Sequence, residues 1–414
     1  MPIKGTITLP GDKSISHRSV MLAALSNQSS KITNISNGKD VKSTISCLID
    51  CGINIDMSPK QLFVTGGEFK QPKSDLDCGN SGTTMRLLIG LLAGQGINAN
   101  FIGDKSLSNR PMDRIIEPLE KMGLNIKSSG IRPPVHISKS KLKGINYNMP
   151  ISSAQVKSSI LLAALGSDTK TKVTEKVTSR DHTEIMLKNI GVDITTEGRS
   201  IIVAPCDKFL PLDIHIPADP STAAFFIGAA VLMPRSRLRV MNMLLNETRI
   251  GFMKALEKMG CSFKYYNVHN EAGEKVGDIE VTHHNLHGIN INAFDIPSII
   301  DELPMLALIA SQAKGITKVS GAKELRVKES DRIKAICKNL REIGGDIVEK
   351  SDGFIINGAT ELTSGNIDTF DDHRIAMTFH VASLISGKKI SLNNTNCVNI
   401  SFPDFFKTIE SIVR

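Results

Sequence analysis

A sixfold repeat is the feature of this sequence that most constrains its fold. Each copy opens with polar or charged residues and continues into a run rich in Ala, Leu, Ile, Val or Met, as residues 152–165 illustrate. A helix that is apolar on nearly all sides must be buried, and the free N–H groups and dipole at its start can hold an anion. Six such helix starts predict a site for negatively charged small molecules. The openings stand at residues 14–18, 81–84, 152–155, 220–222, 301–303 and 371–374.

The second half of five copies predicts a shorter amphipathic helix that ends at a glycine in the left-handed C′ conformation. The alternating segments that follow, for example 192–194 and 201–203, indicate a β-hairpin. A period near 70 residues divides the 414-residue chain into six units. The sixth unit ends in a helix over 405–413 with no strands left, so residues 5–9 at the N-terminus are expected to supply its missing strand. The glycine-terminated segments are 48–52, 119–123, 187–191, 256–260 and 340–344.

Two domains are expected, because 414 residues exceed the usual size of a single domain. We predict one domain from residues 1–12 and 218–414, which holds copies four to six and both chain ends. Residues 13–217 form the other domain, with copies one to three. The active site is expected in the cleft between them.

The composition excludes several classes of partner. The formal charge is +8 with Lys and Arg spread along the chain, which suits anionic substrates, or simply solubility, better than nucleic acid. Aromatic residues make up 4%, too few to stack on single strands. No signal peptide and no apolar run long enough for a bilayer is seen. Seven irregularly spaced cysteines indicate free thiols in a reducing cytoplasm. We therefore expect a cytoplasmic monomer without nucleic-acid or membrane partners, and no cofactor or metal, although His283, His284 and His287 lie close together.

The first copies carry candidate anion ligands. Lys13 and Arg18 both reach toward the start of the first buried helix, where a phosphate or carboxylate could bind; the alternative is a capped helix with exposed basic side chains. A nucleotide P-loop is not favoured, because a single glycine precedes the lysine. Small residues over 79–86 let a ligand approach the backbone closely, or simply form a tight turn.

The last two copies are densest in ionisable groups. Asp301 stands at a helix start, where the dipole favours a carboxylate that need do nothing more. Lys328 and Arg332 are expected on one helix face with Glu329 beside them, a pattern that is ordinary on a surface. His373 is flanked by two Asp and an Arg at a helix start, which favours an acid or base role over a structural one.

Nine segments together resemble the EPSP synthase (3-phosphoshikimate 1-carboxyvinyltransferase) family, in order and over the whole chain, and several resemble its class II division. The resemblance implies an α/β fold of two inverse αβ barrels, with six βαβαββ units, three in each domain. It also implies transfer of a carboxyvinyl group from phosphoenolpyruvate to the 5-hydroxyl of shikimate 3-phosphate. The segments are GDKSISHR (11–18), GNSGTTMR (79–86), NRPMDR (109–114), SSAQVK (152–157), SRDHTE (179–184), IDELP (300–304), RVKESDR (326–332), DDHR (371–374) and SFPDFF (401–406).

The resemblance also implies the site residues. Both substrates carry phosphate and carboxylate groups, so several cations must offset the repulsion between them. The phosphoenolpyruvate site would comprise Lys13, Gly82, Arg110, Gln155, Arg332 and Arg374. The shikimate 3-phosphate site would comprise Ser14, Arg18, Ser153, Gln155, Ser179, Arg180, Asp301 and Lys328. The catalytic candidates are Asp301, placed to take the hydroxyl proton, Glu329 and Lys13, placed for proton transfer at the phosphoenolpyruvate end, and His373.

Two positions depart from the family pattern, and two alternative functions are open. Ile400 stands where many relatives have Lys, and His182 where some have Tyr. One alternative is the enolpyruvyl transferase that acts on UDP-N-acetylglucosamine, but that enzyme usually has a Cys in the loop that corresponds to residues 103–111, and here none is present. The other is a basic nucleic-acid-binding protein, whose retention on DNA or RNA would depend on salt. Glyphosate mimics phosphoenolpyruvate in the family, so the phosphoenolpyruvate site is also its expected target.

Overall fold

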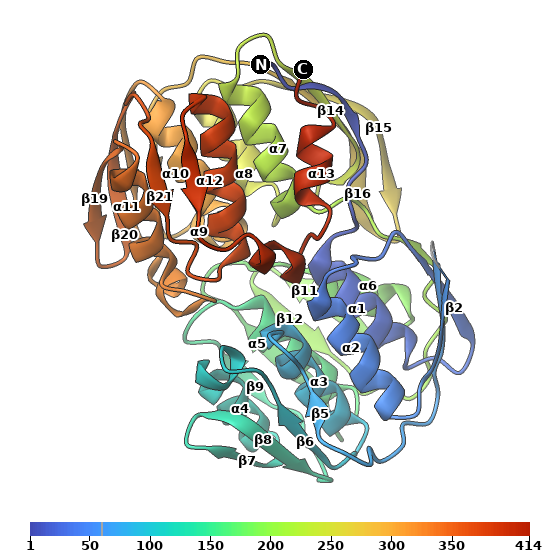
Figure 1. Ribbon diagram of the computed structural model, residues 1–414. Helices are drawn as coiled ribbons and strands as arrows, with labels where there is room; N and C mark the ends of the chain where they lie inside the picture. Colours follow the sequence, from blue (N-terminus) through green and yellow to red (C-terminus); the bar gives the residue numbers. More distant parts are fainter. Residues whose placement is uncertain (59–60) are drawn as a thin grey trace. The chain divides into compact units, whose positions relative to one another are not determined.

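The computed structural model describes residues 1–58 and 61–414, which form two compact units (Figure 1). The first unit contains residues 1–10, 217–270 and 275–414, and the second contains residues 11–216 and 271–274. Residues 11–12, 217 and 271–274 therefore lie in the opposite unit from the one predicted. Backbone contacts explain the first shift, since the Gly11 N–H donates to the Asn34 carbonyl at 3.0 Å. Residues 271–274 belong to the second unit because Glu274 pairs with His182 of that unit.

The sheets of both units share one pattern. Within residues 1–58 and 61–414, five sheets have four strands, a parallel pair extended by an antiparallel hairpin, and one has two parallel strands. This is the predicted α/β repeat, of which the sixth copy keeps only the first two strands. The second unit has β13 (Ile214–His215), β2 (Ser29–Thr33), β4 (Gln61–Thr65) and β3 (Asn54–Ser58); β5 (Leu76–Asp77), β6 (Ala99–Ile102), β8 (Arg132–Ser138) and β7 (Asn125–Ser129); and β9 (Asn146–Asn148), β10 (Thr171–Thr174), β12 (Ser200–Val203) and β11 (Ile194–Glu197).

The first unit holds the remaining sheets. They are β1 (Lys4–Ile7), β14 (Arg237–Leu244), β16 (Glu274–Thr282) and β15 (Phe263–Glu271); β17 (Asn290–Ile291), β18 (Gly315–Val319), β20 (Gly353–Gly358) and β19 (Asp346–Lys350); and β21 (Gly365–Ile367) with β22 (Ile390–Leu392).

The N-terminal strand corrects one prediction. It was expected to complete the sixth copy, but β1 pairs in parallel with β14 of the fourth copy. The fourth copy needs this strand because β13, which precedes it in the chain, pairs with β2 of the first copy instead. Both chain ends do lie in the first unit (Figure 1), and the Arg414 N–H donates to the Pro2 carbonyl at 2.9 Å.

The six buried helices begin where the openings predict. A side chain caps the N-terminus in most of them: for example, Asp12 accepts from the Ile15 N–H at 2.8 Å, and Asp372 accepts from the Arg374 N–H at 2.9 Å. Such caps satisfy N–H groups that have no partner within the helix. The helices are α1 (Lys13–Ala23), α3 (Gly82–Gly94), α5 (Ala154–Ala164), α7 (Pro220–Leu232), α10 (Leu303–Gln312) and α12 (His373–Ser386).

The shorter helices that follow end as predicted, with a glycine of positive φ beyond five of them. They are α2 (Lys39–Asp50), α4 (Asp113–Lys121), α6 (His182–Asn189), α8 (Gly251–Lys258), α11 (Arg332–Glu342) and, at the C-terminus, α13 (Phe405–Glu410). The short helix α9 (Ile296–Ile299) and the 3-10 turns η1 (Leu107–Asn109), η2 (Lys323–Val327) and η3 (Asn396–Ile400) complete the list.

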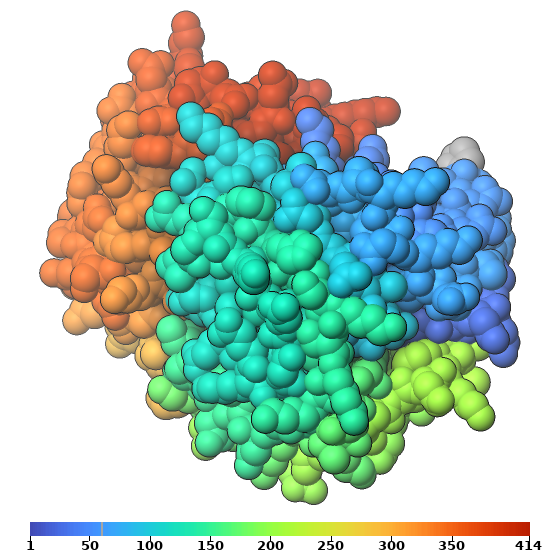
Figure 2. Space-filling model, turned by 90° about the horizontal axis from the view of Figure 1, so that it is seen from below, coloured from blue at the N-terminus to red at the C-terminus, as the bar shows by residue number. Residues whose placement is uncertain are grey.

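Each unit has an apolar core built on its buried helices. In the second unit α3 packs directly on α5, and glycine allows the close approach, since a Cβ on Gly90 would lie 2.1 Å from the Ser159 carbonyl oxygen. In the first unit α7, α10 and α12 pack together (Figure 1), and the ring of Phe405 meets those of Phe225 and Phe226 edge to face. The space-filling view (Figure 2) shows the surface of the second unit in blue through green, the colours of the first half of the chain. In the part of the chain that the structure describes, no helix is long and apolar enough to cross a membrane.

Candidate active site

The start of α1 places Lys13 beside an acidic partner. Lys13 is the first residue of α1, directly after the cap Asp12, and its Nζ lies 2.5 Å from Oδ2 of Asp40 on α2. Both side chains are largely shielded from solvent, with 22% and 9% of their surfaces exposed. The predicted cation is therefore held at a fixed place at the helix start, not on an exposed face.

Arg18 lies one turn further along α1 and is almost completely buried. Its guanidinium donates to Thr183 Oγ1 and Ser158 Oγ, both at 2.7 Å, and to the Ser14 carbonyl at 2.9 Å. The Ser14 hydroxyl in turn accepts from Arg180 Nη1 at 3.2 Å. Helices α1 and α5 and the segment at the start of α6 thus bring together three residues of the predicted shikimate 3-phosphate site. Two guanidinium groups held close together favour an anion as the third partner.

Three residues predicted for phosphoenolpyruvate in the second unit, Gly82, Arg110 and Gln155, lie around Arg86. Arg86 Nη1 donates to Gln155 Oε1 at 2.7 Å, and a Cβ on Gly82 would lie 2.9 Å from the same nitrogen and 3.4 Å from Arg110 Nη1. Arg110 is held by Asn80, whose Oδ1 accepts from Nη2 at 2.7 Å. Sequence reasoning did not single out Arg86, although its position four residues after Gly82 on one helix face was a usable signal.

Two serines of the predicted shikimate 3-phosphate site lie in the same unit. Ser153 caps α5, where its side chain accepts from the Val156 N–H at 3.5 Å. Ser179 is buried, and its hydroxyl donates to the carboxylate of Glu175. Glu175 was not predicted, because nothing in its local sequence marks it as part of a site.

The residues predicted in the first unit converge on Arg332, whose side chain is buried. Its Nε lies 2.7 Å from Asp372 Oδ2, its Nη2 lies 2.6 Å from Glu329 Oε2, and its Nη1 lies 3.4 Å from Asp301 Oδ1. Burial alone would lower the pKa of Arg332, but the charges of Asp372 and Glu329 outweigh it, and the pKa is raised. Burial would likewise raise the pKa of Asp372, but the charge of Arg332 prevails and the pKa is lowered. Asp372 belongs to a quoted motif but was not predicted as a site residue.

Two further cations lie around Asp301. Lys328 Nζ is 3.6 Å from Asp301 Oδ1, and Arg374 Nη1 donates to the Asp301 carbonyl at 3.1 Å. The prediction that Lys328 and Arg332 share one helix face is wrong. Helix α11 begins only at Arg332, and Lys328 precedes it in an extended conformation. Both cations nevertheless reach the same carboxylate, Asp301.

The remaining predicted positions differ in their surroundings. His373 is buried at the start of α12. Ile400, where many relatives have Lys, ends η3 and packs against the apolar core of the first unit. His182 begins α6 and its Nδ1 lies 2.6 Å from Glu274 Oε1, a partner 92 residues away that no local pattern indicated.

The predicted site residues form two clusters, one in each unit, and the two clusters offer different chemical groups. The second unit presents cations with hydroxyl and amide groups, which suit phosphate and carboxylate groups. The first presents cations beside carboxylates, which can also accept and donate protons. Among the side chains of residues 1–58 and 61–414, no group of three or more His, Cys, Asp or Glu could hold a metal ion.

Comparison with known proteins identifies the family. The model of the family "EPSP synthase (3-phosphoshikimate 1-carboxyvinyltransferase)" matches residues 1–409. The 3-phosphoshikimate 1-carboxyvinyltransferase of Oenococcus oeni is 44% identical over 421 residues, which cover 100% of this chain and 96% of that one. The protein of the same name from Oceanobacillus iheyensis is 41% identical over 417 residues, with coverages of 100% and 97%.

Solved structures agree with this result. An EPSP synthase from Acinetobacter baumannii superposes with a TM-score of 0.88 at 38% identity, covering 99% of this chain and 96% of that one. The enolpyruvyl transferase NikO from Streptomyces tendae superposes with a TM-score of 0.79 at 16% identity, covering 99% and 95%, and shows the shared fold alone. The fold is thus one that enolpyruvyl transferases adopt. The chain belongs to the EPSP synthase family, whose members transfer the enolpyruvyl group of phosphoenolpyruvate to shikimate 3-phosphate in aromatic biosynthesis.

Proposed function

We propose that the residues of both clusters bind the two substrates of this reaction. Phosphoenolpyruvate is bound by Lys13, Gly82, Arg110, Gln155, Arg332 and Arg374, and shikimate 3-phosphate by Ser14, Arg18, Ser153, Gln155, Ser179, Arg180, Asp301 and Lys328. The observation that carries the proposal is the approach of Lys328 and Arg332 to Asp301, at 3.6 and 3.4 Å. This arrangement supports the proposal, because a carboxylate that could accept a proton lies beside two cations that could bind an anion.

The reaction proceeds by addition and then elimination. Asp301 takes the proton of the 5-hydroxyl of shikimate 3-phosphate while the hydroxyl oxygen bonds to C2 of phosphoenolpyruvate. C3 of phosphoenolpyruvate gains a proton from Glu329 or Lys13. The cations stabilise the tetrahedral adduct and its phosphate. In the second step the group that gave the proton takes one back from C3, the bond between C2 and the phosphate oxygen breaks, and phosphate leaves with the proton that Asp301 had taken. His373, buried at the start of α12 beside Asp372 and Arg374, is a further candidate for acid or base catalysis in these proton transfers.

We also propose that the enzyme is a cytoplasmic monomer without nucleic-acid partners. The seven cysteines are free thiols, which suit a reducing compartment. Light scattering on the protein as it elutes from a size-exclusion column measures its mass in solution. A mass twice that of one chain would contradict the proposed monomer.

A phosphate-release assay tests the function. Release should require shikimate 3-phosphate and phosphoenolpyruvate together, and release with either one alone would contradict the proposal.

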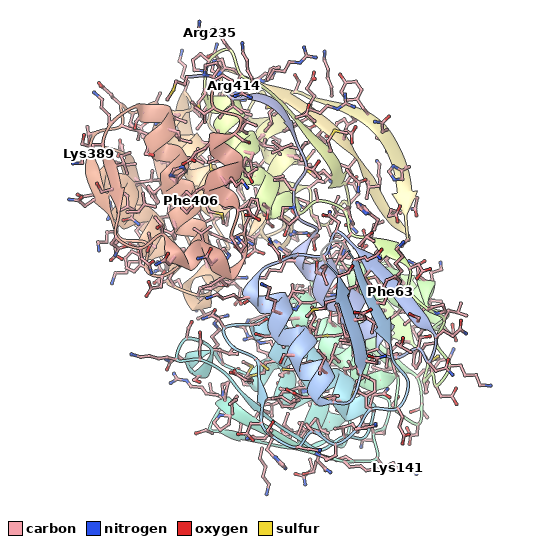
Figure 3. All side chains as sticks on the ribbon, turned by 45° about the vertical axis from the view of Figure 1, so that its right-hand side comes forward. Phe63, Lys141, Arg235, Lys389, Phe406 and Arg414 are labelled. Atoms are coloured by element: carbon pink, nitrogen blue, oxygen red, sulfur yellow. The ribbon has the colours of Figure 1, made fainter. Side chains whose placement is uncertain are left out.

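A variant tests the assignment of the substrates. Arg180→Ala should raise the KM for shikimate 3-phosphate by roughly 10–100-fold, because a charge-assisted hydrogen bond is lost, with a smaller effect on phosphoenolpyruvate. The exposed Arg235 (Figure 3) provides the control, and Arg235→Ala should change neither constant. Equal effects of Arg180→Ala on both substrates would point to a structural role.

A further inference from the structure

Three buried charged side chains in the second unit have no part in the mechanism above. Lys157 on α5 has no exposed surface, and its Nζ lies 2.9 Å from Glu175 Oε2 and 2.6 Å from Glu184 Oε1. Glu175 follows directly after β10, and Glu184 belongs to α6. Burying three charges is costly unless they are paired and hydrogen-bonded, so an arrangement that serves stability alone would be better made from apolar residues.

The two carboxylates differ in what else they contact. Glu175 Oε1 accepts from the Ser179 hydroxyl, and Glu175 Oε2 accepts from the Ser179 N–H at 3.3 Å. Glu184 Oε2 is buried and has no hydrogen-bond partner within residues 1–58 and 61–414. Burial raises the pKa of Glu184, against the opposing charge of Lys157. Of the two carboxylates, only that of Glu175 hydrogen-bonds to a residue of the proposed substrate site, within residues 1–58 and 61–414.

We propose that Glu175 is a positioning residue for shikimate 3-phosphate, which holds Ser179 by its hydroxyl and its backbone, and that Lys157 neutralises Glu175 beside an anion site. The inference rests on the proposed assignment of Ser179 to that substrate. Ser179 would be the only residue between the Glu175 carboxylate and the bound anion, and a carboxylate without a counter-charge at that place would repel the anion. The charge of Lys157 removes this repulsion. The same lysine fixes the carboxylate, because it joins α5 to the end of β10.

The test uses two matched variants of the full-length enzyme. Glu175→Asp keeps the charge that pairs with Lys157 but withdraws the carboxylate from Ser179 by one methylene, and Glu184→Asp makes the same change on the other side of the lysine. We expect E175D to raise the KM for shikimate 3-phosphate about tenfold, the effect of losing one hydrogen bond to a charged group. The KM for phosphoenolpyruvate should change less than about twofold. E184D should leave both constants near those of the wild type.

A double-mutant cycle separates positioning from a purely structural role. Ser179→Ala alone should raise the KM for shikimate 3-phosphate, and E175D should add less in the S179A background than in the wild type, because the hydroxyl contact is already absent and only the backbone contact remains. Additive effects, equal effects of E175D and E184D, or no effect of E175D would each overturn the inference.

A second pair of variants covers the case in which E175D does not fold. Glu175→Gln and Glu184→Gln keep the side-chain length. A glutamine at position 175 must turn its NH₂ group either toward the Lys157 ammonium or toward the Ser179 hydroxyl, both of which donate to the carboxylate of the wild type. Only E175Q should then change the KM for shikimate 3-phosphate, and an unchanged KM would overturn the inference. The wild-type enzyme is assayed first with both substrates. Its inactivity would defeat the proposed function, whereas wild-type kinetics in E175D would defeat the inference alone.

Discussion

Asp372→Asn is the substitution whose outcome follows most directly from the geometry of the first unit. Both oxygens of Asp372 act as acceptors. Oδ2 accepts from Arg332 Nε at 2.7 Å and from Ser330 Oγ at 3.0 Å, and Oδ1 accepts from the Arg374 N–H at 2.9 Å and from Arg332 Nη2 at 3.3 Å. An asparagine amide would therefore face donors in either orientation. It would also remove one negative charge from a buried arginine.

The magnitude can be worked from these contacts. Removing one partner of a buried ion pair costs about 3–5 kcal/mol when the remaining charge is left uncompensated. Arg332 would still have Glu329 at 2.6 Å and Asp301 at 3.4 Å, so the lower figure, about 3 kcal/mol, applies. For a unit of about 200 residues this corresponds to a fall in Tm of roughly 6–12 °C.

The assay is thermal unfolding followed by circular dichroism, with hydrogen exchange of peptides from α11 and α12 to report on the first unit directly. Glu361→Gln is the control, because it removes a carboxylate of the same unit whose side chain is 87% exposed, and its Tm should match that of the wild type. Both α11 and α12 should exchange faster in D372N. A Tm within 1 °C of the wild type, about a tenth of the expected shift, would refute the reasoning.

Three further predictions concern catalysis, the phosphoenolpyruvate site and pH. Asp301→Asn should lower kcat on the order of 100-fold or more, since general-base help is lost, while calorimetry still detects shikimate 3-phosphate binding; near-normal kcat would assign the base elsewhere. Gly82→Ala should raise the KM for phosphoenolpyruvate and weaken competitive inhibition by glyphosate, because the new methyl would lie 2.9 Å from Arg86 Nη1; an unchanged inhibition constant would contradict the steric argument. Burial, together with the charges of Lys13 and Arg18, lowers the pKa of His17 well below its ordinary value. As pH falls below about 6.5 the unfolded chain gains a proton that the folded one does not, so urea denaturation should show wild-type stability falling by up to ~1.4 kcal/mol per pH unit relative to His17→Gln; parallel pH profiles would contradict this.

Local patterns in the sequence predicted the elements but not how they associate. The buried helix starts and the terminating glycines follow from hydrophobic periodicity and cap chemistry, which act over a few residues. The pairing of β1 with β14 does not, because a short alternating segment is equally suited to any open parallel edge. The contacts of Arg249 are likewise set by the fold. In the fold, Arg249 is buried with Nη2 2.9 Å from Asp219 Oδ1 and 3.0 Å from Ser221 Oγ.

The site shows the same division. Its proposed ligands came from resemblance to a family, whereas several of the partners around them, unlike Arg86 and Asp372, had no signal in the sequence. Asp40 lies 27 residues from Lys13, and Glu274 lies 92 residues from His182. Arg332 was expected on an ordinary charged helix face, and only the fold shows it buried among three carboxylates.

The place of β1 determines when the protein can mature during synthesis. Residues 4–7 leave the ribosome before their partner strand, residues 237–244, which follows some 230 residues later. At ordinary rates of translation the N-terminal segment waits on the order of 10–50 s with its backbone unpaired. Nearly all of the second unit emerges in that interval and can fold early, whereas the first unit must wait for both chain ends. A bulky fusion at the N-terminus should therefore delay the first unit and leave the second unaffected.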